Sequence, residues 1–230
     1  MYFPMYGFDS TMLILLPAIL IAMYAQNKVR STYAQYSRVA NRSGMTGSDA
    51  ARLILDRAGL YEVPVEQVAG DLIDHYDPRS KKLRLSQGVY NSSSIAALGI
   101  AAHEVGHAIQ DQQEYIPMKI RGALVPVASI GGNFGFGIFI LGLFLSIPVF
   151  QTIGIVLFSA TVFFQLVTLP VEFNASSRAM AVLEGYSILE SDELGKARQV
   201  LNAAALTYIA AALSGIANLA RLLILRNRRR

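Results

Sequence analysis

Long stretches without charge dominate the pattern of this chain. The longest run, residues 123–171, holds 49 consecutive residues without Asp, Glu, Lys or Arg. A helix needs about 20 apolar residues to cross the hydrocarbon core of a bilayer. Ser146, Ile147 and Pro148 interrupt the run near its middle, where a proline favours a turn. The pattern therefore predicts a transmembrane helical hairpin over 123–171, with spans at about residues 125–145 and 149–169.

Glycines are concentrated in the first of these two spans. Glycine disfavours a helix in water, whereas small residues let membrane helices pack closely against each other. A pair of buried core helices in a soluble protein is the alternative, but a chain of 230 residues leaves too little other structure to bury them. The glycines of this span are Gly131, Gly132, Gly135, Gly137 and Gly142.

The N-terminal apolar stretch predicts a membrane anchor over residues 1–26. Residues 11–25 carry no charge and are followed by basic residues, beginning with Lys28 and Arg30. A cleavable signal peptide has the reverse order, with its positive charges first. Because Lys and Arg beside a span stay on the cytoplasmic side, we expect an uncleaved anchor with its N-terminus outside. Segments 27–122 and 172–200 are then cytoplasmic.

The C-terminal segment, residues 201–230, combines an apolar helix with a basic tail. Residues 203–225 are apolar enough to span, but a crossing would leave Arg221 and the four later arginines outside. We therefore expect a membrane-associated helix that packs on the bundle or lies at the cytoplasmic interface, with its arginines on anionic headgroups. Arginines directly behind an apolar helix indicate a membrane stop rather than a nucleic-acid site.

Composition agrees with this picture. Hydrophobic residues make up 53% of the chain and charged residues 16%, against about 25% charged in an average soluble domain. The chain has no cysteine, which excludes disulfides, thiolate metal ligands and a thiol nucleophile. The net charge of +4 matters less than its distribution along the chain.

The polar segment 27–122 predicts a small layer of helices and strands. Residues 27–39 continue the first helix, and capping residues at 46–49 begin a second helix that ends at Gly59. Residues 62–68 are β-rich, and 72–76 and 82–86 flank a turn-forming segment, which indicates a β-hairpin. Residues 91–94 cap a long helix that begins near Ile95.

That long helix carries the candidate chemistry, the sequence His103-Glu104-Val105-Gly106-His107. Residues four apart on a helix share one face, so His103 and His107 can bind one Zn²⁺. Glu104 is close enough to act as general base and acid toward a water in the metal's open position. Gly106 costs about 1 kcal/mol relative to Ala in a helix, which points to close packing there. The motif predicts a zinc metallopeptidase with one Zn²⁺ per chain.

A catalytic zinc needs a third protein ligand. A metzincin would have a third histidine where this chain has Gln113, and an intramembrane site-2-type protease would use an aspartate on a later span. No aspartate lies between Asp111 and Asp192. This leaves a gluzincin, with a downstream glutamate as ligand. Glu172, at the cytoplasmic end of a predicted span, is the best candidate and Glu184 is the second.

The remaining histidine, His75, is more typical of a hydrogen-bonded turn than of a catalytic group. Its alternative roles are oxyanion donor, substrate contact, or metal ligand in place of Glu172. Tyr76, Tyr90 and Arg178 are weaker candidates for oxyanion stabilisation.

Three segments together resemble the YugP-type neutral zinc metallopeptidases, which are membrane proteins: residues 101–109 (AAHEVGHAI), 169–176 (LPVEFNAS) and 74–80 (DHYDPRS). The similarity covers nearly the whole chain. More distantly, the chain is similar to the HtpX and CAAX prenyl protease gluzincins, whose second motif is Glu-x-x-x-Asp.

This resemblance implies His103, His107 and Glu172 as zinc ligands and Glu104 as catalytic acid/base. The aspartate of the second motif is Ser176 in this chain, and serine hydrogen-bonds a ligating histidine more weakly than a carboxylate does. The resemblance also implies that substrate binds in extended form along an edge strand.

Taken together, we expect a mainly α, multi-pass membrane protein with a small α+β zincin-like catalytic layer on the cytoplasmic face of the cell (inner) membrane. Its expected activity is that of a zinc-dependent endopeptidase. Expected partners are the lipid bilayer and a peptide or membrane-protein substrate, but no nucleic acid. The alternatives are a zinc-stabilised scaffold without activity, an intramembrane site-2-type protease, and a transporter subunit. Few polar residues lie in the spans, which disfavours a transporter, and Glu104 disfavours a purely structural zinc site.

Overall fold

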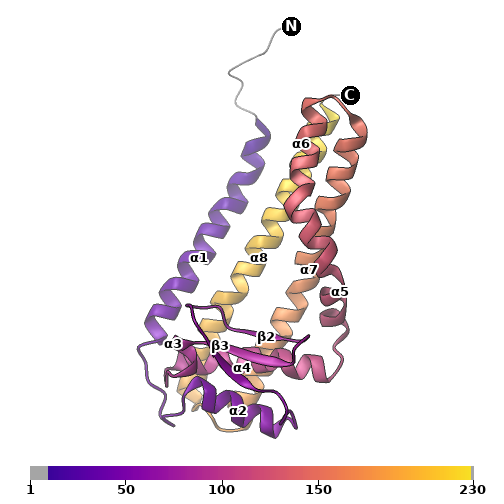
Figure 1. Ribbon diagram of the computed structural model, residues 1–230. Helices are drawn as coiled ribbons and strands as arrows, with labels where there is room; N and C mark the ends of the chain where they lie inside the picture. The colour runs from indigo at the N-terminus through magenta and orange to yellow at the C-terminus, as the bar shows by residue number, and fades with distance from the viewer. Residues whose placement is uncertain (1–9, 229–230) are drawn as a thin grey trace. The chain divides into compact units, whose positions relative to one another are not determined.

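The structure, a computed structural model, describes residues 10–228 (Figure 1). The first nine residues of the predicted anchor, and Arg229 and Arg230 of the basic tail, lie outside the described part. The chain forms two compact units. One contains the N-terminal residues up to Ala25, then Ile120–Thr168, and the chain from Tyr208 onward; the other contains Gln26–Lys119 and Leu169–Thr207.

The fold is mainly helical, as predicted, and four helical segments among the described residues are long and apolar enough to cross a membrane. They are Ser10–Tyr36, which contains α1 (Leu16–Tyr36); Ile116–Phe144, which contains α5 (Ile116–Ile130), a π-helical segment (Gly131–Gly135) and α6 (Phe136–Phe144); α7 (Pro148–Gly185); and α8 (Ser191–Asn227). The break between α6 and α7 falls at the residues that predicted it.

Helix α8 differs from the expectation for the C-terminal segment. It is a single helix of 37 residues that begins at Ser191, well before the apolar stretch at 203–225. By length and composition it belongs with the other three candidate spans.

Close packing of glycines joins the hairpin helices of the first unit. A Cβ atom on Gly154 of α7 would lie 2.6 Å from the backbone nitrogen of Phe139, and one on Gly131 would lie 2.1 Å from the carbonyl oxygen of Leu157. The backbones therefore approach at distances that only glycine allows. Phe139 is fully buried there, beside Leu222 of α8. The glycine-rich span packs as the sequence predicted.

In the second unit, α2 (Gly47–Arg57) begins and ends where its capping signals predict. The side chain of Thr46 accepts a hydrogen bond from the amide of Asp49, and the Asp49 carboxylate accepts one from the amide of Thr46. This reciprocal pair satisfies two amides of the first turn. Gly59, just past the end, has φ of +74°, a conformation that glycine adopts without steric cost.

The second unit also contains a three-stranded sheet in the order β1-β3-β2 (Figure 1). Strands β2 (His75–Asp77) and β3 (Lys82–Ser86) form the predicted antiparallel hairpin, with Tyr76 opposite Leu83. Strand β1 (Val65–Val68) pairs parallel to β3, which local sequence signals did not indicate. Both β1 and β2 are therefore edge strands, and the short α3 (Gln87–Tyr90) follows β3.

Helix α4 (Ile95–Gln112) forms the core of this unit. The Ser94 side chain caps it by accepting a hydrogen bond from the amide of Ala97, as the serine-rich segment before it predicted. Its apolar stripe is buried together with residues of α2 and the sheet. The largest of these buried side chains are Ile54, Leu55, Leu83, Leu85, Ile95, Leu98 and Val105.

Close packing at Gly154 generates a stability prediction. We expect Gly154→Ala to lower the thermal stability of the detergent-solubilised protein, because overpacking costs about 1–3 kcal/mol. Gly137→Ala is the matched control, since a Cβ atom there meets nothing within 4 Å and alanine favours the helix. The melting temperature measures both effects. Equal melting temperatures for the two variants would contradict the close approach of these helices.

Candidate active site

Helices α4 and α7 bring three potential metal ligands together within the second unit. Nε2 of His103 lies 3.2 Å from Oε2 of Glu172, and Nε2 of His107 lies 3.5 Å from the same oxygen. The three ligand atoms are all within 4.8 Å of one another. The two imidazole rings, on successive turns of α4, meet nearly edge to face at an angle of 87°. Both histidines thus direct the same nitrogen at one carboxylate oxygen.

These distances and donor types fit a zinc ion. Zinc bonds of about 2.0–2.2 Å in tetrahedral geometry place neighbouring ligand atoms roughly 3.4 Å apart. Two imidazoles and one carboxylate are the donor set of many catalytic zinc sites, which keep a fourth position for water or substrate. Within residues 10–228, no other group of three histidine, aspartate or glutamate side chains lies close enough to hold a metal ion.

Gly106 allows α4 and α7 to approach each other at this site. A Cβ atom on Gly106 would lie 2.7 Å from the carbonyl oxygen of Ala175. Real Cβ atoms do not come so close to a backbone oxygen, so only glycine permits this contact between the helices. The close-packing reason expected for Gly106 is therefore the approach of the helix that carries Glu172.

The other ring nitrogen of each histidine also has a partner. Nδ1 of His103 lies 3.1 Å from Oγ of Ser176, and Nδ1 of His107 lies 2.9 Å from Oε1 of Gln110. Such partners fix the orientation of a ligating imidazole. The serine that replaces the aspartate of the distant relatives therefore still contacts a histidine. The sequence places Gln110 on the face of the histidines, one turn beyond His107, but gives no signal of this contact.

Glu104 is buried beside the two histidines. Its Oε2 accepts a hydrogen bond of 3.0 Å from the backbone amide of Tyr76 in β2. Burial raises the pKa of the Glu104 carboxyl, and the neighbouring charges of His103 and His107 partly oppose this rise. A carboxyl group whose pKa is raised, and whose orientation is fixed by a strand, is suited to proton transfer.

Strand β2 is anchored at both ends. Before it, the Asp74 carboxylate accepts hydrogen bonds from the backbone amide and the hydroxyl of Ser86. The hydrogen bond from the amide is 2.7 Å long. Along it, the hydroxyl of Tyr76 donates to Oδ2 of Asp111 at 2.7 Å, and Lys81 forms an ion pair with the same oxygen. These contacts tie the strand to the end of β3 and to α4, and therefore hold the amide of Tyr76 against Glu104.

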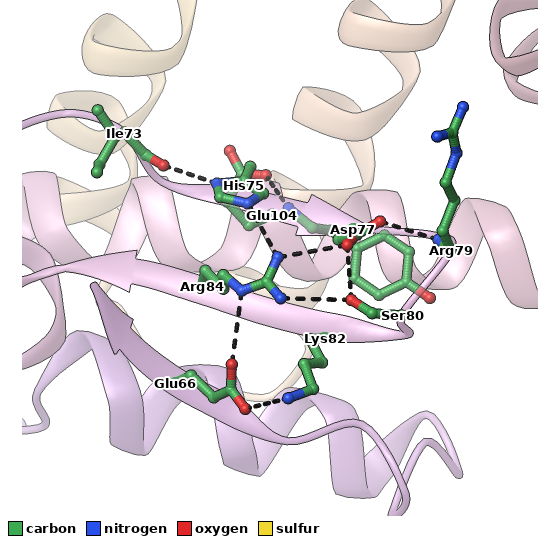
Figure 2. Close-up of polar contacts among 10 residues, drawn as sticks. Glu66, Ile73, His75, Asp77, Arg79, Ser80, Lys82, Arg84 and Glu104 are labelled. Atoms are coloured by element: carbon green, nitrogen blue, oxygen red, sulfur yellow. Dashed lines mark hydrogen bonds and ion pairs between the residues drawn. The ribbon is translucent and has the colours of Figure 1, made fainter. Parts of the chain in front are cut away.

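His75 takes part in a different network, which Figure 2 shows around Arg84. Nδ1 of His75 lies 2.8 Å from the carbonyl oxygen of Ile73, and Nε2 lies 3.4 Å from Nη1 of Arg84. Arg84 also pairs with Asp77 and Glu66. Successive residues of a strand face opposite sides, so His75 is on the other face from the buried Tyr76. His75 is exposed and lies outside the metal-ligand group.

The remaining candidates from the sequence also lie outside this group. Glu184, the second choice for third ligand, is exposed. Tyr90 packs against the apolar core. Nε of Arg178 donates a hydrogen bond to Oδ1 of Asn174, and the Tyr76 hydroxyl donates one to Oδ2 of Asp111. Among the third-ligand candidates, only Glu172 lies beside both histidines.

A cluster of two imidazoles and a buried carboxylate, together with four helices among residues 10–228 that are long and apolar enough to cross a membrane, is the combination expected of a membrane zinc peptidase. Comparison with known proteins agrees, because the profile of the family described as "Putative neutral zinc metallopeptidase" matches residues 11–227. The chain belongs to this family, which confirms the resemblance found in its sequence.

One relative extends this assignment. The chain is 46% identical over 208 residues to "Putative membrane protease YugP" of Bacillus subtilis (strain 168), and the alignment covers 90% of this chain and 92% of that protein. No solved structure shows a significant match.

The contact at Gly106 generates a second prediction. We expect Gly106→Ala to weaken both thermal stability and zinc binding, because α4 and α7 must separate to admit the methyl group, at about 1–3 kcal/mol. Gly99→Ala, on the same helix, is the control, since its Cβ atom would meet Ala197 at an ordinary 3.7 Å. Unfolding and zinc titration of the purified protein test this. Wild-type behaviour of Gly106→Ala would rule out a tight contact.

Proposed function

We propose that this protein is a membrane-embedded zinc endopeptidase that hydrolyses peptide bonds. The observation that carries the proposal is the convergence of His103 Nε2 and His107 Nε2 on Oε2 of Glu172, at 3.2 and 3.5 Å, with the buried Glu104 beside them. Membership of a zinc metallopeptidase family and the relation to a membrane protease support it.

His103, His107 and Glu172 would hold the ion in this proposal. A zinc ion supplies polarisation of the scissile carbonyl and a water of lowered pKa. The Glu104 carboxylate accepts a proton from the attacking water and later delivers it to the leaving amine. The amide of Tyr76 holds that carboxylate in place, and burial of Glu104 keeps its pKa above that of an exposed glutamate.

The geometry of β2 supports an extended substrate. In an antiparallel pair, the amide and carbonyl of one residue point to the same side. The amide of Tyr76 points to Glu104 and away from β3, so the carbonyl of Tyr76 also points away from β3. Because β2 is an edge strand, this carbonyl can accept a hydrogen bond from an extended peptide. A peptide lying there would pass the carboxylate of Glu104.

The charge distribution supports a cytoplasmic active site. Fifteen of the 20 Lys and Arg residues lie between Lys28 and Arg198, and five follow Ala220. If all four candidate helices cross the membrane, the five C-terminal arginines and the N-terminus lie on one side. The 15 basic residues from Lys28 to Arg198 then belong to the other side. The positive-inside bias places the larger group in the cytoplasm. We therefore propose substrates that are membrane proteins or membrane-adjacent peptide segments.

The ligand set favours an enzyme over a zinc-stabilised scaffold. A structural zinc site has four protein ligands, whereas only three potential ligands come together here among the residues that the structure describes. None of the three is an aspartate, the ligand that a site-2-type protease would use.

The role of Glu104 is tested by Glu104→Gln. We expect cleavage of a peptide library by the full-length protein in detergent to fall by about 10²–10⁴-fold, because the glutamine amide cannot accept the proton. Zinc content should stay at one ion per chain by metal analysis, since Glu104 is not a ligand. A variant that cleaves like the wild type would remove Glu104 from the mechanism.

The third ligand is tested separately by Glu172→Gln. We expect this change to lower zinc occupancy, because a neutral amide is a poorer zinc ligand than a carboxylate. Glu184→Gln on the same helix is the control and should keep its zinc, since Glu184 is exposed and outside the group. Full occupancy in Glu172→Gln would refute Glu172 as ligand.

A further inference from the structure

Gln110 is completely buried between α4 and α7, and its side-chain amide has three partners. Oε1 lies 2.9 Å from Nδ1 of His107, whereas Nε2 donates to the carbonyl oxygen of Val171 at 2.8 Å and to Oδ1 of Asn174 at 2.9 Å. Asn174 Oδ1 also accepts a 2.7 Å hydrogen bond from Nε of Arg178. A chain of hydrogen bonds therefore leads from Arg178 to a candidate metal ligand.

In this hydrogen-bond network, the donor and the acceptor of every bond are fixed. A guanidinium group can only donate, so Asn174 presents its oxygen to Arg178. The carbonyl of Val171 can only accept, and the oxygen of Asn174 likewise. The group of Gln110 that faces them must therefore be its NH₂, which leaves the oxygen of Gln110 facing His107. Because that oxygen carries no hydrogen, Nδ1 of His107 must be the donor.

A neutral imidazole with hydrogen on Nδ1 has its lone pair on Nε2. Nε2 of His107 is the atom directed at Glu172. We propose that Gln110 is a positioning residue that holds His107 in the tautomer whose Nε2 can bind the metal; this rests on the proposed zinc site. Gln110 also binds the carbonyl next to Glu172, so the same side chain aligns ligands from both helices.

The two histidines differ in this respect. The partner of His103 is the hydroxyl of Ser176, which can either donate or accept. Ser176 therefore orients the ring of His103 without selecting its tautomer, whereas Gln110 selects that of His107. The role proposed for Gln110 is therefore specific to His107 and differs from general packing around the site.

The test measures zinc affinity of the full-length protein in detergent by competition with a chromophoric chelator. We expect Gln110→Met, which has no acceptor, to bind zinc about 10–100-fold more weakly than wild type. Gln110→Glu keeps an acceptor for Nδ1–H but loses the donor to Val171 and Asn174, so it should lose less zinc affinity than Gln110→Met. Gln112→Met is the control on the same helix, because Gln112 is exposed and donates to the carbonyl of Ala58. It should bind zinc like the wild type.

Wild-type affinity in Gln110→Met, or an equal loss in Gln110→Glu, would overturn the inference. A second measurement needs no variant: proton NMR of the Co²⁺-loaded wild type should show a shifted His107 Nδ1–H that exchanges slowly with solvent, and its absence would also overturn the inference. A wild-type protein that binds no zinc would refute the proposed function itself. If the wild type binds zinc and cleaves peptides while Gln110→Met binds zinc equally tightly, only the role of Gln110 fails.

Discussion

The close approach of α4 and α7 is the contact on which the candidate site depends. Gly106 lets the backbone of one helix lie against Ala175 of the other, and this contact falls between the two histidines in sequence. A side chain at position 106 would separate the helices and draw Glu172 away from both imidazoles. The glycine is unfavourable for the helix by itself, so its value lies in the contact that it permits.

Burial of two carboxylates at this site carries an electrostatic cost in free energy. Glu104 and Glu172 are both buried, and they share their surroundings with two histidines. Removing a carboxylate from water costs several kcal/mol unless partners compensate for it. The Tyr76 amide compensates in part for Glu104. A divalent cation at the three ligand atoms would balance the remaining negative charge, which is the electrostatic reason for the proposed metal.

Strand β2 connects this site to the rest of the second unit. Its central residue, Tyr76, contacts Glu104 through the backbone and Asp111 through the hydroxyl. The same short strand is an edge of the sheet, so the element that orients the proposed base is also the element proposed to bind the substrate peptide. In the proposed mechanism, this arrangement sets the position of the substrate backbone relative to the base.

The sequence by itself determined the local features of this protein. The capping box at Thr46 and Asp49, the start of α4 after Ser94 and the break before Pro148 follow from interactions between residues a few positions apart. The shared face of His103 and His107 follows from helical periodicity alone. Tertiary structure decided the parallel pairing of β1 with β3, the position of Glu172 beside the histidines and the partners of Gln110. These depend on contacts between residues far apart in the chain, such as His103 and Glu172, and no local propensity encodes which distant side chains will meet.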